Sequence, residues 1–482
     1  MMKFLRISGQ DKLKLPYNLR SNQQEIIDTI EKGLQSKNHI VIEAPTGSGK
    51  TFTSLASSLP FVINKSYKII YCVRTNSQQE QVIRELKAFK DSGNNFSVVA
   101  IQGRQSMCPQ QKDDDELAKS NWSEKSKICK SLKLQSKLGE AGCPYYRKLL
   151  RPSKSLIDRW SLEIYSAEEF IANAESENIC PYELNKLLLK EAQIVIVPYV
   201  YFFEDFIRKY LLGWMDTTID KIITIVDEAH NLPDWSREAA SESLSVDSLH
   251  RASQESDKFG LLLGDGSPPT LFLDLVESAL KSLGEYHIPE GDDEGLLPSH
   301  IVSLDSEVPT FETEMMSLGK MTLYRLKQQS SDLSKMGQLI RQTLLEKGKR
   351  PRSYLGSVGD FLCRWLDSIE SHTIRLVGNK PLRLEKVCLD PRVMTSFLDE
   401  TAGVVMMSGT LSPLGMFRDL VGLKPDSKLE RFGSIFPKEN RLVRYVSDVS
   451  TSYRELNLSL IHISEPTRPL YISYAVFCLK KK

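Results

Sequence analysis

One stretch constrains the fold of this chain more than any other: residues 39–51, which read H-I-V-I-E-A-P-T-G-S-G-K-T. Ile40–Ile42 form a short apolar run that predicts a buried strand, and apolar residues recur at helical spacing after Lys50. A strand, a glycine loop and a helix in this order favour phosphate binding, because glycines let backbone N–H groups turn inward and the helix N-terminus adds a positive dipole end. The alternative is a plain strand-to-helix turn, which the complete G-K-T ending disfavours.

The loop carries the residue types that nucleotide binding needs. Lys50 can reach the β- and γ-phosphates, and the hydroxyl of Thr51 can bind Mg²⁺. Ala44 replaces the first glycine of the usual G-x-x-x-x-G-K-[S/T] pattern. The predicted nucleotide contacts in the loop are Pro45, Thr46, Gly47, Ser48, Gly49, Lys50 and Thr51.

A second motif, I-I-T-I-V-D-E-A-H-N at Ile222–Asn231, predicts a buried strand that ends in two carboxylates. Ligands bind at the carboxyl edge of parallel sheets, so Asp227 and Glu228 are expected there. Asp227 can hold Mg²⁺, and Glu228 can orient and deprotonate the water that attacks the γ-phosphate. Alone, an Asp-Glu pair would suggest a solvated turn. Together with the P-loop, it predicts a hydrolysis site with Lys50, Asp227 and Glu228 as catalytic residues.

The rest of the sequence predicts an α/β fold with a parallel sheet, because short apolar runs alternate with helical patterns. The expected strands are 40–42, 68–73, 97–101, 193–197, 222–226 and 404–407. At 482 residues and 41% hydrophobic composition, the chain can form several domains with real cores. No apolar run approaches the ~20 residues of a membrane span and no signal-peptide core is present, so no membrane partner is expected. The net charge of +1 gives no global basic field.

Four of the eight cysteines fall in one region between the two nucleotide motifs: Cys108, Cys129, Cys143 and Cys180. Reduced thiols are expected inside cells, which argues against disulfides. Zinc modules usually bring their cysteines in tight C-x₂₋₄-C pairs, which these are not. Isolated thiolates, three of them followed by proline, suit an iron–sulfur cluster better. Zinc and four unrelated buried thiols stay open as alternatives.

In combination, these motifs resemble those of a known family. A-P-T-G-S-G-K-T, Y-C-V-R-T-N-S-Q, the four spaced cysteines, D-E-A-H and S-G-T-L-S-P follow one another in the order found in iron–sulfur superfamily 2 DNA helicases. The resemblance is strongest to the xeroderma pigmentosum group D (XPD/DinG) type in its archaeal form. It covers about residues 17–438.

The resemblance implies roles for further residues. It places Arg20 and Gln23 at the adenine side of the nucleotide, with Thr51 and Asp227 on Mg²⁺. It implies a [4Fe–4S] cluster on the four cysteines. Single-stranded DNA would contact Arg74, Thr75, Ser77 and Gln78. Coupling between nucleotide and DNA would involve His230, Ser408, Gly409 and Thr410.

The resemblance also implies the domain organisation: a RecA-like P-loop parallel sheet, an inserted iron–sulfur domain, an inserted mainly helical arch domain and a second RecA-like domain that is largely missing. Motor domain 1 would comprise residues 1–105, 184–235 and 381–414, with the cluster domain at 106–183 and the arch at 236–380. Residues 415–460 would begin motor domain 2. Its Q-x-x-G-R-x-x-R segment is not found, and residues 461–482 read as a tail foreign to the family.

The function implied by the resemblance is that of an ATP-dependent DNA helicase that translocates 5′-to-3′ on single-stranded DNA in DNA repair. Its expected partners are forked or bubble DNA and repair proteins. It would act as a monomer, in the cytoplasm beside the nucleoid, or in the nucleus of a eukaryote. The alternative is a non-motor protein that binds single-stranded DNA or a partner and has little ATPase activity, because the second motor domain is missing. The R-T-N-S-Q and S-G-T-L-S-P segments disfavour a P-loop ATPase that acts on proteins or small molecules.

Overall fold

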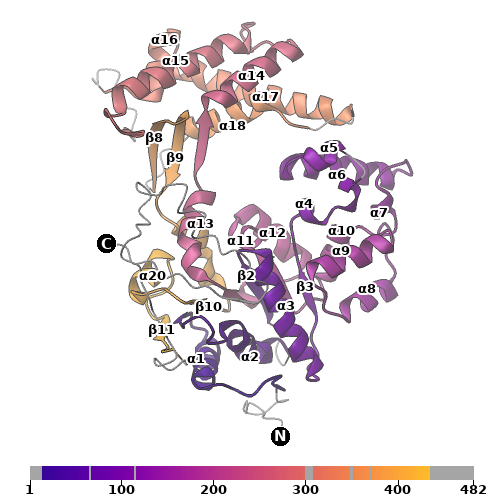
Figure 1. Cartoon of the computed structure of the whole chain (residues 1–482). Helices are drawn as coiled ribbons and strands as arrows, with labels where there is room; N and C mark the ends of the chain where they lie inside the picture. Colours follow the sequence, from indigo (N-terminus) through magenta and orange to yellow (C-terminus); the bar gives the residue numbers. More distant parts are fainter. Residues whose placement is uncertain are drawn as a thin grey trace, which may run out of the picture. The chain divides into compact units, whose positions relative to one another are not determined.

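The computed structural model describes residues 13–63, 67–112, 115–298, 308–347, 351–367 and 372–434. Its largest sheet has seven strands in the order β11-β1-β10-β5-β2-β4-β3, and each pairing is parallel (Figure 1). The strands are β1 (Ile40–Glu43), β2 (Lys68–Val73), β3 (Val98–Ala100), β4 (Ile194–Pro198), β5 (Ile222–Val226), β10 (Gly403–Ser408) and β11 (Lys428–Arg431). The predicted parallel α/β sheet is confirmed.

Both faces of this sheet are covered, as expected for parallel strands that read as continuous apolar runs. Ile40 and Ile42 of β1 pack in one core, and Val41 between them packs in the core on the opposite face. Three helices contribute to the core that contains Ile40 and Ile42: α1 (Gln23–Gln35), α2 (Lys50–Ile63) and α3 (Asn76–Asp91). In α2 every side chain from Thr51 to Val62 is buried. The helix that follows the P-loop is therefore fixed within the core.

The core on the opposite face, which contains Val41, includes helices from the segment between β4 and β5. These are α11 (Tyr199–Phe203) and α12 (Asp205–Trp214), followed by the 3-10 turn η2 (Ile219–Lys221). Tyr199, Phe203 and Phe397 form part of a cluster of edge-to-face aromatic rings beneath the sheet. Such ring pairs add to the energy of burial itself.

The insert that carries the four cysteines lies between β3 and β4, and its described elements are helical. They are α4 (Arg104–Met107), η1 (Pro109–Lys112), α5 (Asp115–Lys119), α6 (Trp122–Lys137), α7 (Pro144–Arg147), α8 (Lys154–Ser161), α9 (Ala167–Ser176) and α10 (Pro181–Leu188). Asn121 and Ser166 begin α6 and α9 with capping boxes, in which the cap side chain and the third residue of the helix satisfy each other's backbone N–H groups. Local capping thus sets where these helices begin.

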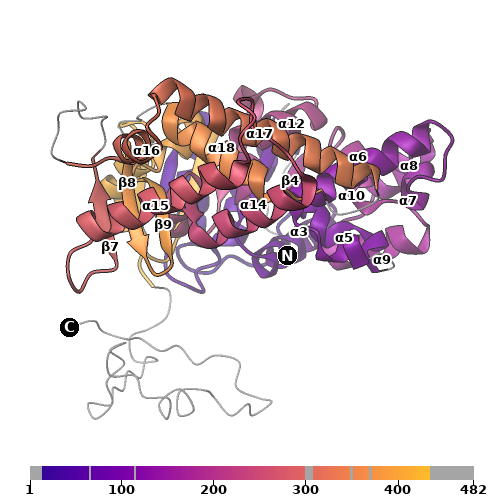
Figure 2. The same cartoon turned by 90° about the horizontal axis from the view of Figure 1, so that it is seen from above.

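The second insert combines helices with a small sheet. The turn η3 (Ala229–Asn231) and α13 (Leu232–Ala239) lead into it from β5. Its helices α14 (Val246–Phe259), α15 (Pro269–His287), α17 (Leu323–Glu346) and α18 (Tyr354–Asp367) pack on one another, with α16 (Phe311–Gly319) against α15 (Figure 2). An antiparallel sheet has the order β6-β9-β8-β7 and consists of β6 (Glu242–Ser245), β7 (Glu294–Leu297), β8 (Thr373–Asn379) and β9 (Leu382–Cys388). The sequence predicted the helices of this insert but not its sheet.

The described residues after the second insert return to the large sheet. The short turns α19 (Arg392–Thr395) and η4 (Ser396–Glu400) precede β10, and α20 (Leu414–Leu420) leads to β11. Because β11 pairs with β1, these residues belong to the sheet that carries the P-loop. The proposed domain limits stay predictions. The remainder of 415–460 and the expected foreign tail at 461–482 lie outside the described residues.

None of the helices described here combines the length and the apolar character that crossing a bilayer requires.

Candidate nucleotide site and cysteine cavity

The P-loop runs from the end of β1 to the start of α2 and adopts a conformation that depends on glycine. Gly47 and Gly49 have φ angles of 83° and 82°, in the region that side chains other than glycine rarely adopt. A Cβ atom at Gly49 would lie 2.4 Å from Nε2 of Gln23. The ammonium group of Lys50 donates to the backbone oxygen of Ala44 at 3.1 Å and so lies across the loop.

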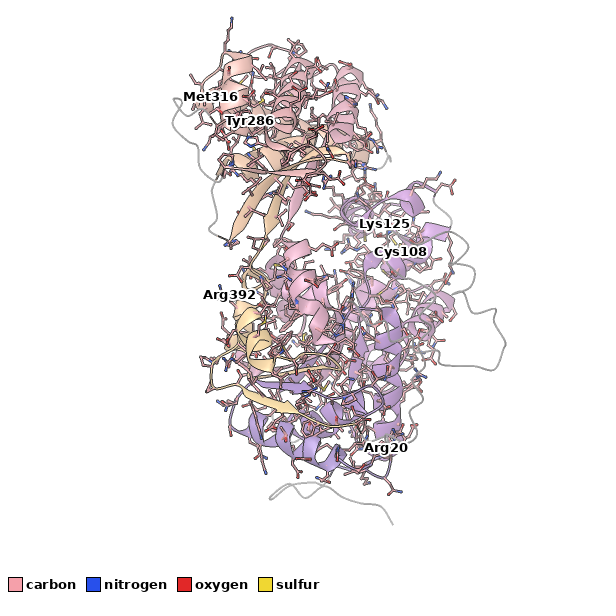
Figure 3. The ribbon with its side chains drawn as sticks, turned by 60° about the vertical axis from the view of Figure 1, so that its left-hand side comes forward. Arg20, Cys108, Lys125, Tyr286, Met316 and Arg392 are labelled. Atoms are coloured by element: carbon pink, nitrogen blue, oxygen red, sulfur yellow. The ribbon has the colours of Figure 1, made fainter. Side chains whose placement is uncertain are left out.

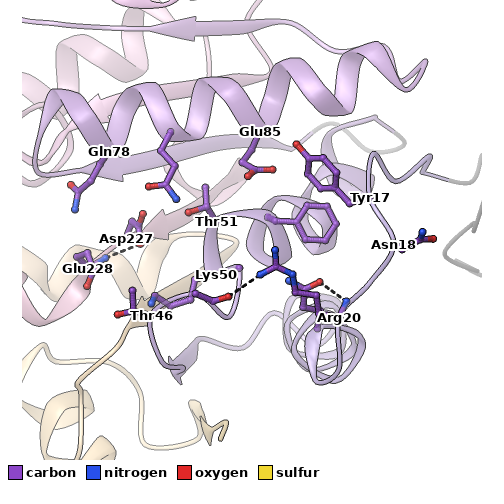
Figure 4. Close-up of a pocket in the computed structure, with 15 residues that line it drawn as sticks. Tyr17, Asn18, Arg20, Thr46, Lys50, Thr51, Gln78, Glu85, Asp227 and Glu228 are labelled. Carbon is purple, nitrogen blue, oxygen red and sulfur yellow. Dashed lines mark hydrogen bonds between the residues drawn. The ribbon is translucent and has the colours of Figure 1, made fainter. Parts of the chain in front are cut away.

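A cavity of about 470 Å³ opens beside the loop, a size typical of small-molecule sites (Figure 4). Four segments far apart in the sequence line it. The lining residues are Tyr17, Asn18, Arg20, Gln23, Thr46, Gly47, Gly49, Lys50, Thr51, Phe52, Gln78, Gln81, Glu85, Asp227 and Glu228. Most of the predicted nucleotide contacts therefore surround one cavity. Pro45 and Ser48 do not line it, and Ser48 is buried in the loop.

Gln23 connects α1 to the P-loop and uses both atoms of its amide. Its Oε1 accepts the backbone N–H of Arg20 at 2.9 Å, and its Nε2 donates to the backbone oxygen of Ser48 at 3.0 Å. The guanidinium of Arg20 donates to the backbone oxygen of Gly47 at 3.2 Å. Both residues thus brace the loop, while the predicted reading of the adenine base stays a prediction.

The two carboxylates of the second motif lie at the carboxyl end of β5, as the sequence predicted, and both face the cavity (Figure 4). Asp227 is 6% exposed, and burial together with the negative charge of Glu228 raises the pKa of Asp227 to about 6. A cation bound here would lower the pKa of Asp227 again, because a nearby positive charge favours the ionised carboxylate. Glu228 has a φ of 46°, so its backbone turns sharply as it leaves the strand. Backbone strain of this kind is common where a side chain must be aimed.

Two of the predicted coupling residues, Ser408 and His230, contact Glu228. The hydroxyl of Ser408, at the end of β10, donates to Oε2 of Glu228 at 3.0 Å and lies 2.6 Å from Nδ1 of His230. Nδ1 of His230 is 3.3 Å from the same carboxylate oxygen. The backbone N–H of Thr410 lies 3.5 Å from Oγ of Ser408. A Cβ at Gly409 would lie 3.8 Å from Oγ1 of Thr46, so the 408–412 loop passes close to the P-loop.

The predicted DNA contacts lie where β2 meets α3. Arg74, Thr75 and Ser77 are exposed. Arg74 donates to Oδ1 of Asn231 at 2.5 Å, which ties this turn to the second nucleotide motif. Thr75 and Gln78 form a capping box at the start of α3. Gln78 also lines the nucleotide cavity, so the structure places this residue on the nucleotide side of the turn.

The four predicted cluster cysteines line one small cavity of about 30 Å³, together with Arg104 and Lys125. Figure 3 shows Cys108 and Lys125 in neighbouring positions of this insert. Burial raises the pKa of Cys108 to about 11 and also raises the pKa of Cys143 and Cys180, although backbone N–H groups facing each sulfur oppose the rise. Across the described residues, no three His, Cys, Asp or Glu side chains converge closely enough to hold a single metal ion.

Sequence reasoning missed several residues of these sites. Gln81 and Glu85 follow Gln78 on one face of α3, so helical spacing from Gln78 could have placed them beside the nucleotide. Tyr17 lines the cavity with its ring 5.6 Å from that of Phe52, a contact that depends on how the N-terminal segment folds over α2. No local sequence pattern predicts the contact between Tyr17 and Phe52.

A parallel sheet, a P-loop and a strand-end carboxylate pair around one cavity define a RecA-like P-loop nucleotide-binding protein. Two family profiles match the chain: DEAD_2 over residues 71–249 and the helical and beta-bridge domain over residues 267–455. The chain belongs to the XPD-type family of superfamily 2 helicases.

Curated relatives are similar at moderate identity. The ATP-dependent DNA helicase CHL1 of Vanderwaltozyma polyspora is 24% identical over 436 residues, which is 86% of this chain and 50% of the relative. The general transcription and DNA repair factor IIH helicase subunit XPD/RAD3 of Saccharomyces cerevisiae is 25% identical over 255 residues, 50% of this chain and 32% of the relative. The chain thus spans half or less of the length of these relatives.

Solved structures support the fold. The structure titled XPD_Helicase matches with a TM-score of 0.54 at 21% identity, covering 86% of this chain and 62% of that one. The structure titled Truncated XPD matches with a TM-score of 0.52 at 20% identity, covering 85% of this chain and 100% of that one.

Proposed function

We propose that this chain is the nucleotide-binding part of an ATP-dependent DNA helicase that translocates on single-stranded DNA in DNA repair. The observation that carries the proposal is the link from Glu228 in the nucleotide cavity to Ser408 and His230. A nucleotide-binding protein without a mechanical task needs the cavity but not this link. Its relatives, a DNA helicase and a helicase subunit of a DNA repair factor, support the same proposal.

In the proposed reaction, the P-loop N–H groups and Lys50 bind the phosphates of ATP, while Thr51 and Asp227 hold Mg²⁺. Glu228 orients a water and accepts its proton as the γ-phosphoryl group is transferred. Ser408 and His230 hold the Glu228 carboxylate in place through the contacts described above. A change of nucleotide state can therefore reach the 408–412 loop directly.

The cysteine cavity fits a [4Fe–4S] cluster by the chemistry of its donors. Four thiols line one space, backbone N–H groups face three of the sulfurs, and two cations stand beside them. Cys108, Cys129, Cys143 and Cys180 would hold the cluster, which would supply a redox-active centre and would join four separate segments of chain. The thiols would lose their protons on binding, and coordination to iron would offset the cost of burying the resulting negative charge.

Single-stranded DNA is the proposed substrate, bound through the exposed Arg74, Thr75 and Ser77 at the start of α3. Hydroxyl and guanidinium groups of this kind contact phosphates and carry little sequence information. We propose 5′-to-3′ movement of a monomer on forked or bubble DNA, with repair proteins as partners, beside the nucleoid or in a nucleus. Binding should weaken as salt rises, because each neutralised phosphate releases counterions.

The deciding experiment measures ATP hydrolysis with and without single-stranded DNA, and strand displacement on duplexes with a 5′ or a 3′ single-stranded tail. The proposal expects hydrolysis that DNA stimulates and displacement from the 5′ tail, both abolished in Lys50→Ala. Salt-sensitive DNA binding without DNA-stimulated hydrolysis would instead establish the non-motor function.

A further inference from the structure

Glu43 is a buried acidic residue at the root of the P-loop that the reaction proposed above does not use. It is the last residue of β1, directly before Ala44, and is 6% exposed. An ionised carboxylate in such a position is costly unless its oxygens have partners. In this structure both of its oxygens have them.

One oxygen of Glu43 is bound to the loop that follows β10. Oε2 accepts the backbone N–H of Leu411 at 2.8 Å and that of Ser412 at 2.5 Å. The other oxygen, Oε1, pairs with Nε of Arg431 on β11 at 2.8 Å. Burial opposes the charge of Glu43, but the hydrogen bonds from Leu411 and Ser412 and the charge of Arg431 outweigh it and lower the pKa of Glu43.

The 408–412 loop is thus fixed at both ends. At its start, the Ser408 hydroxyl contacts Glu228 and His230. At its far end, two successive backbone N–H groups converge on the Glu43 carboxylate. At the same starting residue, the backbone oxygen of Ser408 accepts the N–H of Ala44, the first residue of the P-loop.

We infer that Glu43 is a positioning residue that fastens the 408–412 loop to the root of the P-loop, so that Ser408 holds Glu228 in its working orientation. Glu43 touches neither nucleotide nor reacting atoms, since it does not line the nucleotide cavity. Its effect passes through the loop backbone to Ser408 and from there to the carboxylate. This inference rests on the proposed nucleotide hydrolysis at that site.

Three substitutions separate the length of the Glu43 side chain from its charge. Glu43→Ala removes the acceptor, and Glu43→Asp keeps the charge but is one methylene too short to reach the loop. Glu43→Gln keeps the length and one carbonyl oxygen for Leu411 and Ser412. Arg431→Ala is the matched control, because the Arg431 side chain is 71% exposed and its ion pair is therefore screened.

The direct measurement is amide hydrogen exchange of the peptide that contains Leu411 and Ser412, in the full chain. Exchange there should be at least roughly tenfold faster in Glu43→Ala and Glu43→Asp, since hydrogen bonds are what protect amides in a loop. Glu43→Gln and Arg431→Ala should stay near wild type. If Glu43→Ala does not fold, the contrast between Asp and Gln decides the same question. Equal exchange in the Asp, Gln and wild-type proteins would overturn the inference.

A kinetic measurement separates positioning from a merely structural role. In Glu43→Asp the kcat for ATP should fall roughly tenfold to a hundredfold, as small misplacements of catalytic groups do, while KM changes little. Glu43→Gln should restore most of the rate. A rise in KM comparable to that of Lys50→Ala would overturn the inference, because Glu43 would then act on the P-loop itself. If wild type neither binds nor hydrolyses ATP, the proposed function fails, and the exchange series still shows whether Glu43 fastens the loop.

Discussion

The nucleotide cavity and the cysteine cavity are both lined by residues from distant parts of the sequence, yet they are held together in different ways. Around the nucleotide cavity, functional side chains bind the neighbouring elements directly: Gln23 holds Ser48, and Ser408 holds Glu228. Around the cysteine cavity, the contacts that join the segments lie beside the thiols. The backbone N–H of Cys180 donates to Tyr145, and that of Cys143 donates to Oγ of Ser136.

This difference indicates what holds the side chains of each site in position. The nucleotide cavity is built on a buried sheet, so the protein alone fixes the positions of its groups. The cysteine cavity is built mostly from short helices, which need further contacts to stay in place. We therefore expect the first site to tolerate loss of its ligand and the second to depend on the group that its thiols bind.

The largest expected effect comes from removing one cysteine. Cys143→Ser should lose nearly all bound iron and the absorbance near ~400 nm that thiolate-ligated clusters show, and its insert should become sensitive to proteases. Cys363→Ser, on α18 away from the cavity, is the control and should keep both. Iron content and limited proteolysis measure the outcome. Stoichiometric zinc without iron in anaerobically prepared wild type would refute the cluster.

The same variant tests the other half of the comparison. Nucleotide binding by Cys143→Ser should stay within about threefold of wild type, a change below 1 kcal/mol, because no cysteine of that insert lines the nucleotide cavity. A nucleotide site that disappears with the cluster would show that the two regions are not ordered independently.

The next effect concerns chemistry inside the nucleotide cavity. Glu228→Gln should lower the rate of hydrolysis by roughly 10²–10⁴, the usual contribution of a general base, because an amide cannot accept the proton of the water. Nucleotide affinity should change little, since the side chain keeps its shape. Steady-state kinetics and nucleotide titration together separate the two. Equal weakening of binding and rate would mean that Glu228 holds metal or structure.

A smaller effect is expected for Ser408→Ala. One hydrogen bond to a carboxylate contributes about 1.5–3 kcal/mol, so the rate of hydrolysis should fall by roughly 10- to 150-fold. In a protein that already carries Glu228→Gln, Ser408→Ala should have little further effect on the rate. A double-mutant cycle of rates checks this. Additive effects of the two substitutions would show that Ser408 does not act through Glu228.

The smallest expected effect is a pH dependence of folding stability, caused by a residue of α1. Burial and the nearby Asp28 raise the pKa of Glu31 on α1 from 4.5 to about 7. The folded state then binds more protons than the unfolded state between these values, so stability falls as pH rises from about 4.5 to about 7. Glu31→Gln should be more stable than wild type by about 1–2 kcal/mol at pH 8, after allowing for partial exposure, and equal to it near pH 4.5. Denaturant unfolding at both values measures the difference.

The sequence predicted the central sheet well because its strands are continuous apolar runs; β2 and β5 have the predicted bounds. It missed the antiparallel pair β8 and β9, whose half-buried side chains follow a weaker alternating pattern. It missed Glu43, because Leu411 lies 368 residues further along the chain. It did not place Gln78 beside the nucleotide, because the rotation of α3 that brings Gln78 to the nucleotide cavity is set by packing; the DNA contact of Gln78 stays a prediction.

The most direct test of the nucleotide site is a titration of wild-type chain and of Lys50→Ala with a non-hydrolysable ATP analogue and Mg²⁺. We expect one nucleotide bound per wild-type chain, and an affinity weaker by roughly 10- to 150-fold in Lys50→Ala, where a charge-assisted contact worth about 1.5–3 kcal/mol is lost. Omission of Mg²⁺ should also weaken binding to wild type, because Thr51 and Asp227 would lose the ion through which they act. Equal binding by the two proteins, unaffected by Mg²⁺, would contradict this expectation.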